Sequence, residues 1–172
     1  MKIGTLALIL FLSACASFNQ SVKSNTITFE DLSRFKIGTT TSFEVTQSFG
    51  TQYIRIEKNG YYILTYNDSE TGYQRFSANF YSSDNVLFSL LWLPLPYEKG
   101  FSLAETKKRF KSATFEESPG EPPHPHIIPH VFLLRDEKLG ISILYDKYSV
   151  TVDGIAIFDV HSRLPAKQKS AE

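Results

Sequence analysis

Residues 53–66 read YIRIEKNGYYILTY, and this stretch decides the fold. Both of its halves are rich in β-branched and aromatic residues, which favour strands. Asn59 and Gly60 separate the halves, and Asn-Gly between two such segments is the strongest short-range signal for a hairpin, because both residues tolerate a positive φ. The stretch therefore predicts an antiparallel hairpin with strands at 53–58 and 61–66.

Two short helices are expected before this hairpin. The first spans 28–35, where Thr28 can cap the helix and acidic residues follow at its positive end. The second begins with a capping box formed by Thr41 and Glu44 and ends at Gly50. Neither helix is long enough to be stable alone, so both should pack on a sheet.

More strands are expected after the hairpin, at 72–81, 86–93, 131–135, 140–145 and 148–160. In 72–81 apolar and polar residues alternate, which is typical of a strand with one buried face. The segment 86–93 is apolar on both faces except at Ser89, so it is either central and covered twice or partly exposed for docking. Asp153 and Gly154 predict a turn or bulge in the last strand.

A helix-then-strands pattern recurs in the second half of the chain. Ser102 and Glu105 form another candidate capping box, which opens a helix to about residue 111. The recurrence fits either an internal duplication or chance similarity. Between this helix and the later strands, residues 118–129 are rich in proline and predict an extended loop.

The amino-terminal end carries a lipoprotein signal. Lys2 and an apolar run at 3–12 precede Leu12-Ser13-Ala14-Cys15, which has the pattern of a bacterial lipobox. We expect cleavage before Cys15 and attachment of acyl chains, palmitate among them, to its sulfur and its new amine. Ala16 follows the cysteine, and in a Gram-negative source this favours the outer membrane over inner-membrane retention.

Composition excludes several classes of protein. The formal net charge is +0 and no basic stripe is evident, so nucleic acid is not an expected partner. The chain has 1 Cys, which the lipid would occupy, so no disulfide is expected. Aromatic residues make up 14% of the chain, which is consistent with many of them packing against strands. No second apolar segment reaches membrane-spanning length.

Three histidines are the main candidate for chemistry. His124, His126 and His130 lie in one proline-rich loop, and imidazole is a common ligand of zinc, copper and nickel. The intervening prolines restrict how the rings can converge, so a solvent-exposed loop is the alternative. We expect no metal site and no cofactor.

No arrangement typical of an enzyme is evident. His161 and Ser162 are adjacent in the sequence, and adjacent residues in a strand point apart, which argues against a catalytic triad. The acidic pairs Glu116-Glu117 and Asp136-Glu137 flank loops and are interpreted as solvated turns. We therefore expect no catalytic residues and no enzyme activity.

A group of tyrosines lies on or beside the predicted strands. Tyrosine is enriched at interface hot spots, so some of these residues could form a docking face. Alternatively they complete the core with their hydroxyl groups at its rim. The residues concerned are Tyr61, Tyr62, Tyr66, Tyr73 and Tyr81.

Residues 38–50, GTTTSFEVTQSFG, resemble a motif of the SmpA/OmlA family, the BamE-like outer-membrane lipoproteins. Residues 80–87, FYSSDNVL, resemble the later hairpin of that family. The resemblance implies an α+β fold, with short N-terminal helices packed on an antiparallel sheet. It also implies a scaffold that binds other envelope or outer-membrane proteins. Secreted inhibitors with duplicated domains offer a second analogy, which implies ligand binding or inhibition of a soluble periplasmic enzyme.

These observations predict a lipid-anchored outer-membrane lipoprotein that faces the periplasm and binds proteins in envelope integrity or outer-membrane protein assembly. The expected organisation has five parts. They are a signal peptide at 1–14, a flexible tether at 15–27, a BamE-like α+β unit at 28–97, a second α+β unit at 98–165, and a disordered tail at 166–172.

Overall fold

The computed structural model describes residues 27–95, 98, 101–120 and 130–162. The signal peptide, nearly all of the predicted tether and the predicted tail lie outside these residues. None of the described helices is long and apolar enough to cross a membrane. The elements, in chain order, are η1 (Phe29–Arg34), α1 (Ser42–Phe49), β1 (Ile54–Lys58), β2 (Tyr61–Asn67), β3 (Gln74–Tyr81), β4 (Leu87–Trp92), α2 (Leu103–Arg109), β5 (Glu116–Pro119), β6 (Val131–Asp136), β7 (Ile141–Asp146) and β8 (Thr151–Phe158).

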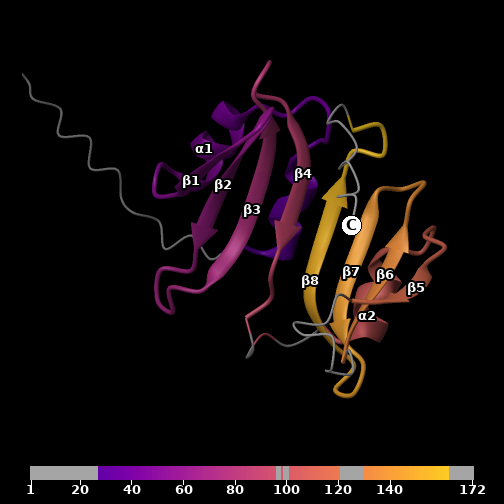
Figure 1. The fold of residues 1–172 in the computed structure, drawn as a ribbon. Helices are drawn as coiled ribbons and strands as arrows, with labels where there is room; N and C mark the ends of the chain where they lie inside the picture. Colours follow the sequence, from indigo (N-terminus) through magenta and orange to yellow (C-terminus); the bar gives the residue numbers. More distant parts are fainter. Residues whose placement is uncertain (1–26, 96–97, 99–100, 121–129, 163–172) are drawn as a thin grey trace, which may run out of the picture.

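All eight described strands form one antiparallel sheet in the order β1-β2-β3-β4-β8-β7-β6-β5 (Figure 1). Each half of the chain supplies helical turns and then four strands that follow one another across the sheet. The last strand of each half lies at the centre, where β4 pairs with β8 from Ser89 opposite Phe158 to Trp92 opposite Ile155. The strand order is therefore symmetric about this central pair.

The predicted BamE-like α+β fold is wrong. The described chain is mainly an open sheet of eight strands, and its three helices are only six, eight and seven residues long. The cause is the pairing of β4 with β8, which makes the strands of the second half continue the first sheet. An internal duplication and chance similarity stay the two hypotheses for the recurring pattern.

Most local predictions of the hairpins are confirmed. Lys58 pairs with Tyr61 across the Asn59-Gly60 turn, where Gly60 has a φ of 82°. The bulge expected in the last strand is present, because Leu144 pairs with Gly154 and Tyr145 with Val152, which leaves Asp153 as the extra residue.

The proline-rich segment was predicted wrongly at its start, because residues 116–119 form β5. This strand is at the edge of the sheet, where Pro119 does not need to donate a hydrogen bond to a further strand.

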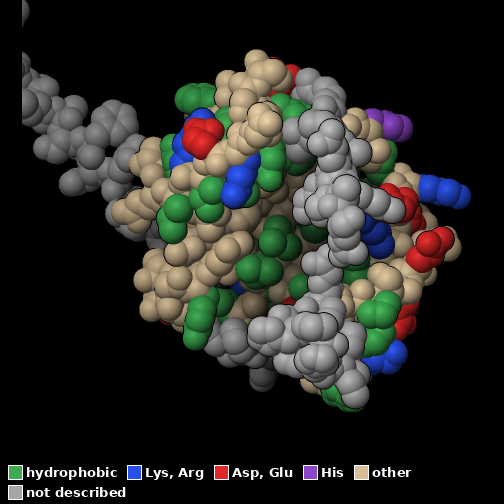
Figure 2. All heavy atoms as spheres, viewed as in Figure 1, with side chains coloured by type: hydrophobic (Ala, Val, Ile, Leu, Met, Phe, Trp, Pro, Cys, Tyr) green, Lys and Arg blue, Asp and Glu red, His purple; other side chains and the backbone are tan. Residues whose placement is uncertain are grey.

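The helices cover one face of the sheet, and Figure 2 views the molecule from the opposite face. Leu32 of η1 and Val45 and Phe49 of α1 belong to the core cluster. Leu103 at the start of α2 and Phe110 just after its end pack against the same cluster. We call the covered face the helix side and the other the open face.

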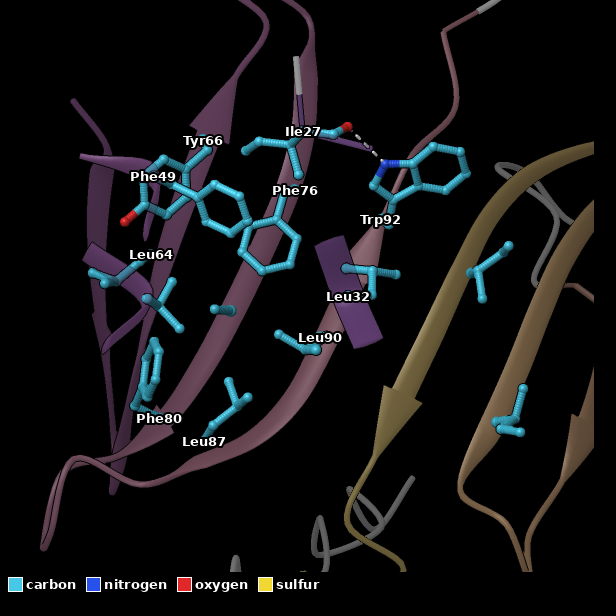
Figure 3. Close-up of a cluster of buried hydrophobic side chains, with 14 of the residues drawn as sticks. Ile27, Leu32, Phe49, Leu64, Tyr66, Phe76, Phe80, Leu87, Leu90 and Trp92 are labelled. Atoms are coloured by element: carbon cyan, nitrogen blue, oxygen red, sulfur yellow. Dashed lines mark hydrogen bonds between the residues drawn. The ribbon is translucent and has the colours of Figure 1, made fainter. Parts of the chain in front are cut away.

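The core lies between the sheet and the helices. Alternate residues of β2, β3 and β4 point into it, as the alternation in 72–81 predicted. Figure 3 shows Phe76 and Phe80 of β3 among Leu64, Leu90 and other apolar side chains. Phe76 and Phe80 are both fully buried, and burial of such side chains contributes about 2–3 kcal/mol each.

Two helices begin as their sequences predict. The Thr41 hydroxyl accepts a hydrogen bond from Glu44 N, and the Glu44 carboxylate accepts one from Thr41 N at 2.7 Å. Ser102 caps α2 through its hydroxyl, but the Glu105 carboxylate pairs with Lys108 at 2.6 Å. The second capping box is therefore formed only on the serine side.

The prediction that Asp136 lies in a solvated turn is wrong, because its side chain is buried. The residue is 5% exposed, and its carboxylate accepts hydrogen bonds from Thr114 N at 2.6 Å, Lys138 N at 2.9 Å and Leu139 N at 3.0 Å. Hydrogen bonds to backbone N–H groups hold the pKa of Asp136 below its ordinary value of 3.8. The ionised carboxylate therefore closes the turn between β6 and β7.

This depressed pKa predicts a pH-dependent contribution to stability. A carboxyl group whose pKa is lower in the folded state stabilises the fold above its unfolded pKa, and this is lost as pH falls through the folded value. We expect Asp136→Asn to lower the free energy of unfolding at about pH 6, and the gap to wild type to narrow towards about pH 2.5. Urea unfolding at both pH values measures this.

Glu137→Gln is the matched control, because the neighbouring Glu137 side chain is 69% exposed and forms a surface ion pair with Arg135. We expect it to change the free energy of unfolding little. A gap for Asp136→Asn that stays constant with pH would contradict the role given to its carboxylate.

Candidate functional site

Several predicted site residues lie outside the described part of the chain. These are Cys15, His124 and His126. His130 is described; it is exposed, and its backbone oxygen accepts a hydrogen bond from Lys147 N at 2.8 Å. Within residues 27–95, 98, 101–120 and 130–162, no group of three or more His, Cys, Asp or Glu side chains is placed to hold a metal ion.

The five tyrosines divide between the two alternatives. Tyr62 and Tyr66 are buried on the helix side, and the Tyr62 hydroxyl donates to Asn85 Oδ1 at 2.9 Å. Burial raises the pKa of Tyr66, so its hydroxyl stays protonated at neutral pH. Tyr73 is 65% exposed in the loop before β3. Tyr61 and Tyr81 point to the open face, where Tyr61 is partly buried and Tyr81 is only 3% exposed.

The open face is defined by the register of the strands, because residues opposite each other in a pair point to the same face. Leu91 of β4 is opposite both Ser77 of β3 and Ala156 of β8, and Leu144 of β7 is opposite Gly154. The register places on this face, in the six inner strands, Tyr61, Ile63, Thr65, Ser77, Asn79, Tyr81, Ser89, Leu91, Thr151, Gly154, Ala156, Phe158, Ser142, Leu144, Asp146, Val131, Leu133 and Arg135. Phe88, the extra residue of the bulge in β4, joins them through its ring contacts with Tyr61 and Tyr81.

No described helix covers this face, although it carries apolar side chains. Ile63, Leu91, Leu133 and Leu144 are partly buried, whereas Ser77, Tyr81 and Phe88 on the same face are buried. Figure 2 shows hydrophobic side chains in the middle of the described part of this face. An apolar area of this kind marks a site of interaction when polar residues surround it.

Small residues on β8 shape the centre of the open face. A Cβ atom added to Gly154 would lie 3.1 Å from the Leu93 side chain and 3.5 Å from the Leu91 side chain. Gly154 has no side chain and Ala156 has only a methyl group, so the side chains of Leu91 and Leu93 can pack over β8 close to its backbone. The centre is therefore shallow and apolar.

Aromatic rings lie beside this centre, towards the turn of β3 and β4. The ring of Phe88 lies 4.5 Å from that of Tyr81 and 5.6 Å from that of Tyr61, between centroids. The Tyr81 hydroxyl donates to Asp159 Oδ2 at 3.3 Å. The cluster joins β2, β3 and β4 to the end of β8.

An open cavity of about 360 Å³ adjoins the aromatic cluster. Its lining includes Phe88, Ser89, Phe158 and Arg135. The Arg135 guanidinium lies 4.6 Å from the centroid of the Phe158 ring and pairs with Glu137 at 2.9 Å. Charged groups are thus held at the margin of the face, while the residues around Leu91 carry none.

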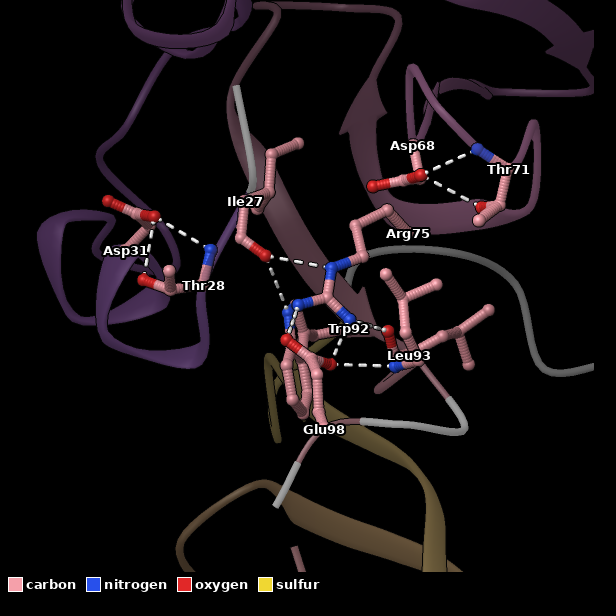
Figure 4. A network of polar contacts seen from close by, with 10 residues as sticks. Ile27, Thr28, Asp31, Asp68, Thr71, Arg75, Trp92, Leu93 and Glu98 are labelled. Atoms are coloured by element: carbon pink, nitrogen blue, oxygen red, sulfur yellow. Dashed lines mark hydrogen bonds and ion pairs between the residues drawn. The ribbon is translucent and has the colours of Figure 1, made fainter. Parts of the chain in front are cut away.

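A separate buried polar cluster has a structural role (Figure 4). Arg75 donates from Nε to Ile27 O at 2.9 Å and from Nη1 to Leu93 O at 2.8 Å, and its guanidinium forms an ion pair with Glu98. Trp92 Nε1 donates to the same Ile27 oxygen at 3.1 Å, and the Trp92 ring lies 4.7 Å from Arg75 Cζ. Four of the five guanidinium N–H groups donate to these partners, so the cluster is interpreted as a structural one.

Comparison with known proteins gives no relative. No protein-family model matches the chain, and no curated protein or solved structure matches it significantly. Membership of the SmpA/OmlA family stays a prediction that rests on residues 38–50 and 80–87. Function must therefore be argued from the surface itself.

Proposed function

We propose that this chain is a lipid-anchored lipoprotein of the outer membrane that faces the periplasm and binds another envelope protein through its open face. The observation that carries the proposal is a sheet face that no described helix covers and whose centre is apolar and free of charge. The activity is binding and scaffolding, without chemistry.

The composition of the open face supports a protein partner. The centre of a protein interface is depleted in charged residues and enriched in aromatic ones, while its rim is polar. Leu91 and Leu144 occupy the centre, the partly buried Tyr61 packs on the buried Phe88 beside them, and Arg135 stands towards the edge. Serines interleave with the leucines and supply hydrogen-bonding groups.

The size of the face also favours a protein over a small ligand. Eight strands have seven intervals of about 4.8 Å, which give a width of about 34 Å, and six residues at about 3.3 Å each give a length of about 20 Å. The product, on the order of 700 Å², is close to the area of about 800 Å² that one partner contributes to a stable protein interface. A small ligand would need an enclosed pocket instead.

Anchoring explains how such a module works. Acyl chains on Cys15 would confine the domain to a thin layer beside the membrane, since each buried CH₂ contributes about 0.8 kcal/mol. Confinement raises the effective concentration of the domain for partners in the same layer. A binding face of moderate affinity is then sufficient.

Substitutions on the open face are expected to abolish capture of the partner. Leu91→Glu places a charge at the apolar centre, and Ser142→Arg places a bulky charge on a partly exposed position of the adjacent half. We expect each to weaken binding at least about tenfold, because an unpaired charge in an interface costs several kcal/mol. Mild crosslinking and affinity purification from cells measure the recovered partner.

Phe43→Glu is the matched control, because Phe43 lies on α1 and is 70% exposed. It should recover the same partner as wild type. Thermal unfolding shows which variants are folded. Recovery of an outer-membrane protein supports scaffolding, and recovery of a soluble periplasmic enzyme supports the alternative of inhibition. Equal recovery with all three folded variants argues against the open face.

A further inference from the structure

The two edges of the sheet differ in how they are protected. β5 ends one edge with Glu116, Glu117 and Pro119; charges of a single sign oppose pairing with a second copy, and proline cannot donate a hydrogen bond to an added strand. β1 ends the other edge without a proline, and its charged residues are of both signs. Its two isoleucines are 55% exposed at Ile54 and 40% exposed at Ile56. The β1 edge is therefore the one suited to pairing with another strand.

The hairpin register shows which backbone groups of β1 point outward. A two-residue turn is closed by a hydrogen-bonded pair, here Lys58 and Tyr61, and hydrogen-bonded and non-hydrogen-bonded pairs then alternate. Ile54, Ile56 and Lys58 therefore direct their N–H and C=O groups to β2. Arg55 and Glu57 direct theirs away from the sheet, where an added strand would meet them.

Arg55 and Glu57 carry opposite charges, and their side chains project from the same side of β1. Arg55 Nε lies 2.6 Å from Glu57 Oε1, and Arg55 Cζ lies 3.7 Å from the centroid of the Tyr62 ring. The two isoleucines point to the opposite side, which is the open face, because Ile56 is paired with Ile63. The β1 edge thus has one charged side and one aliphatic side.

Two copies of β1 can pair antiparallel through the outward-pointing backbone groups of Arg55 and Glu57. Three registers bring these residues opposite each other. A twofold axis at Arg55 places two arginines opposite each other, and an axis at Glu57 places two glutamates opposite each other. Directly opposed like charges are destabilising. An axis at Ile56 places Arg55 opposite Glu57 of the partner subunit, twice by symmetry, so charge selects this register.

We infer that β1 pairs with β1 of a second copy of this chain about a twofold axis at Ile56, which joins two eight-stranded sheets edge to edge. Arg55 and Glu57 of the partner subunit form a hydrogen-bonded pair. Ile56 faces Ile56 of the partner subunit in a close, non-hydrogen-bonded pair on the open face. The charge pattern of β1 is complementary to itself, which is why the occupant is a second copy.

Cysteine crosslinking tests the register. The full chain carrying Cys15→Ser has no other cysteine, so Ile56→Cys supplies the only thiol. Non-hydrogen-bonded partners have Cα atoms about 4.5 Å apart, which lies within the disulfide range. We expect rapid formation of a covalent dimer on mild oxidation.

Ile54→Cys is the matched control in the same background. Ile54 lies on the same strand and face and is more exposed, but its opposite residue would be Lys58 of the partner subunit. The two thiols introduced by Ile54→Cys would be about 14 Å apart along the strands, too far for a disulfide. Equal crosslinking of both variants, or none at Ile56→Cys, overturns the inference.

A charge swap gives an independent test by sedimentation. Arg55→Glu alone and Glu57→Arg alone each place like charges opposite each other and should weaken dimerisation at least about tenfold. The double variant restores opposite charges and should dimerise as wild type does. Failure of the double variant to recover, or a wild-type chain that stays monomeric, overturns the inference. These results are independent of what binds the open face.

Discussion

Replacing Arg75 with methionine is expected to lower the free energy of unfolding by about 3–5 kcal/mol, because it breaks a buried ion pair by removing one partner. The Arg75 side chain is 1% exposed and that of Glu98 is 20% exposed. Methionine keeps much of the packing volume but leaves the Glu98 carboxylate and the oxygens of Ile27 and Leu93 without this donor. Equilibrium unfolding in urea measures the loss.

Lys108→Met is the matched control for this prediction. Lys108 pairs with Glu105 at 2.6 Å, but its side chain is 69% exposed. A solvent-exposed ion pair contributes about 0–1 kcal/mol, so the control should unfold almost as wild type does. Similar small losses for both variants would mean that the cluster around Arg75 does not join β3 to the segment after β4.

Replacing Cys15 with serine is expected to remove the protein's attachment to the membrane. Serine lacks the sulfur that the acyl chain requires, so the domain should be released or remain an unprocessed precursor. Membrane fractionation and mass spectrometry of the amino-terminal peptide measure this. Ser17→Ala, two residues away, is the matched control and should leave the lipid in place.

Unchanged fractionation of Cys15→Ser would exclude the lipid anchor. A wild-type amino terminus that bears no fatty acid would do the same. Neither result would bear on the open face as a binding surface, so anchoring and binding are tested separately.

Local structure was predictable where short-range chemistry decides it. The Asn59-Gly60 turn, the Thr41 cap and the alternation around Phe76 each depend on neighbours a few residues away, and all are present. The strand order depends on β4 meeting β8, which joins residues such as Ser89 and Phe158. No local pattern encodes that pairing, so the fold class was predicted wrongly.

The candidate site was only partly predictable, for a similar reason. The segment 86–93 was open to two interpretations, and each describes part of it: Leu90 and Trp92 are buried, whereas Leu91 is only partly buried on the open face. Nothing in the sequence around Arg75 distinguishes it from a solvent-exposed charged residue of a strand. Its burial follows from the later segment around Glu98, which sequence alone does not place beside it.

Position-specific photo-crosslinking in intact cells tests the central claim most directly. A photoreactive residue is placed at Ser142 on the open face or, separately, at Phe43 on the outer surface of α1. We expect the probe at Ser142 to crosslink to one envelope protein and the probe at Phe43 not to do so. Crosslinking to the same protein from Phe43 alone, or equally from both positions, would contradict a docking role for the open face.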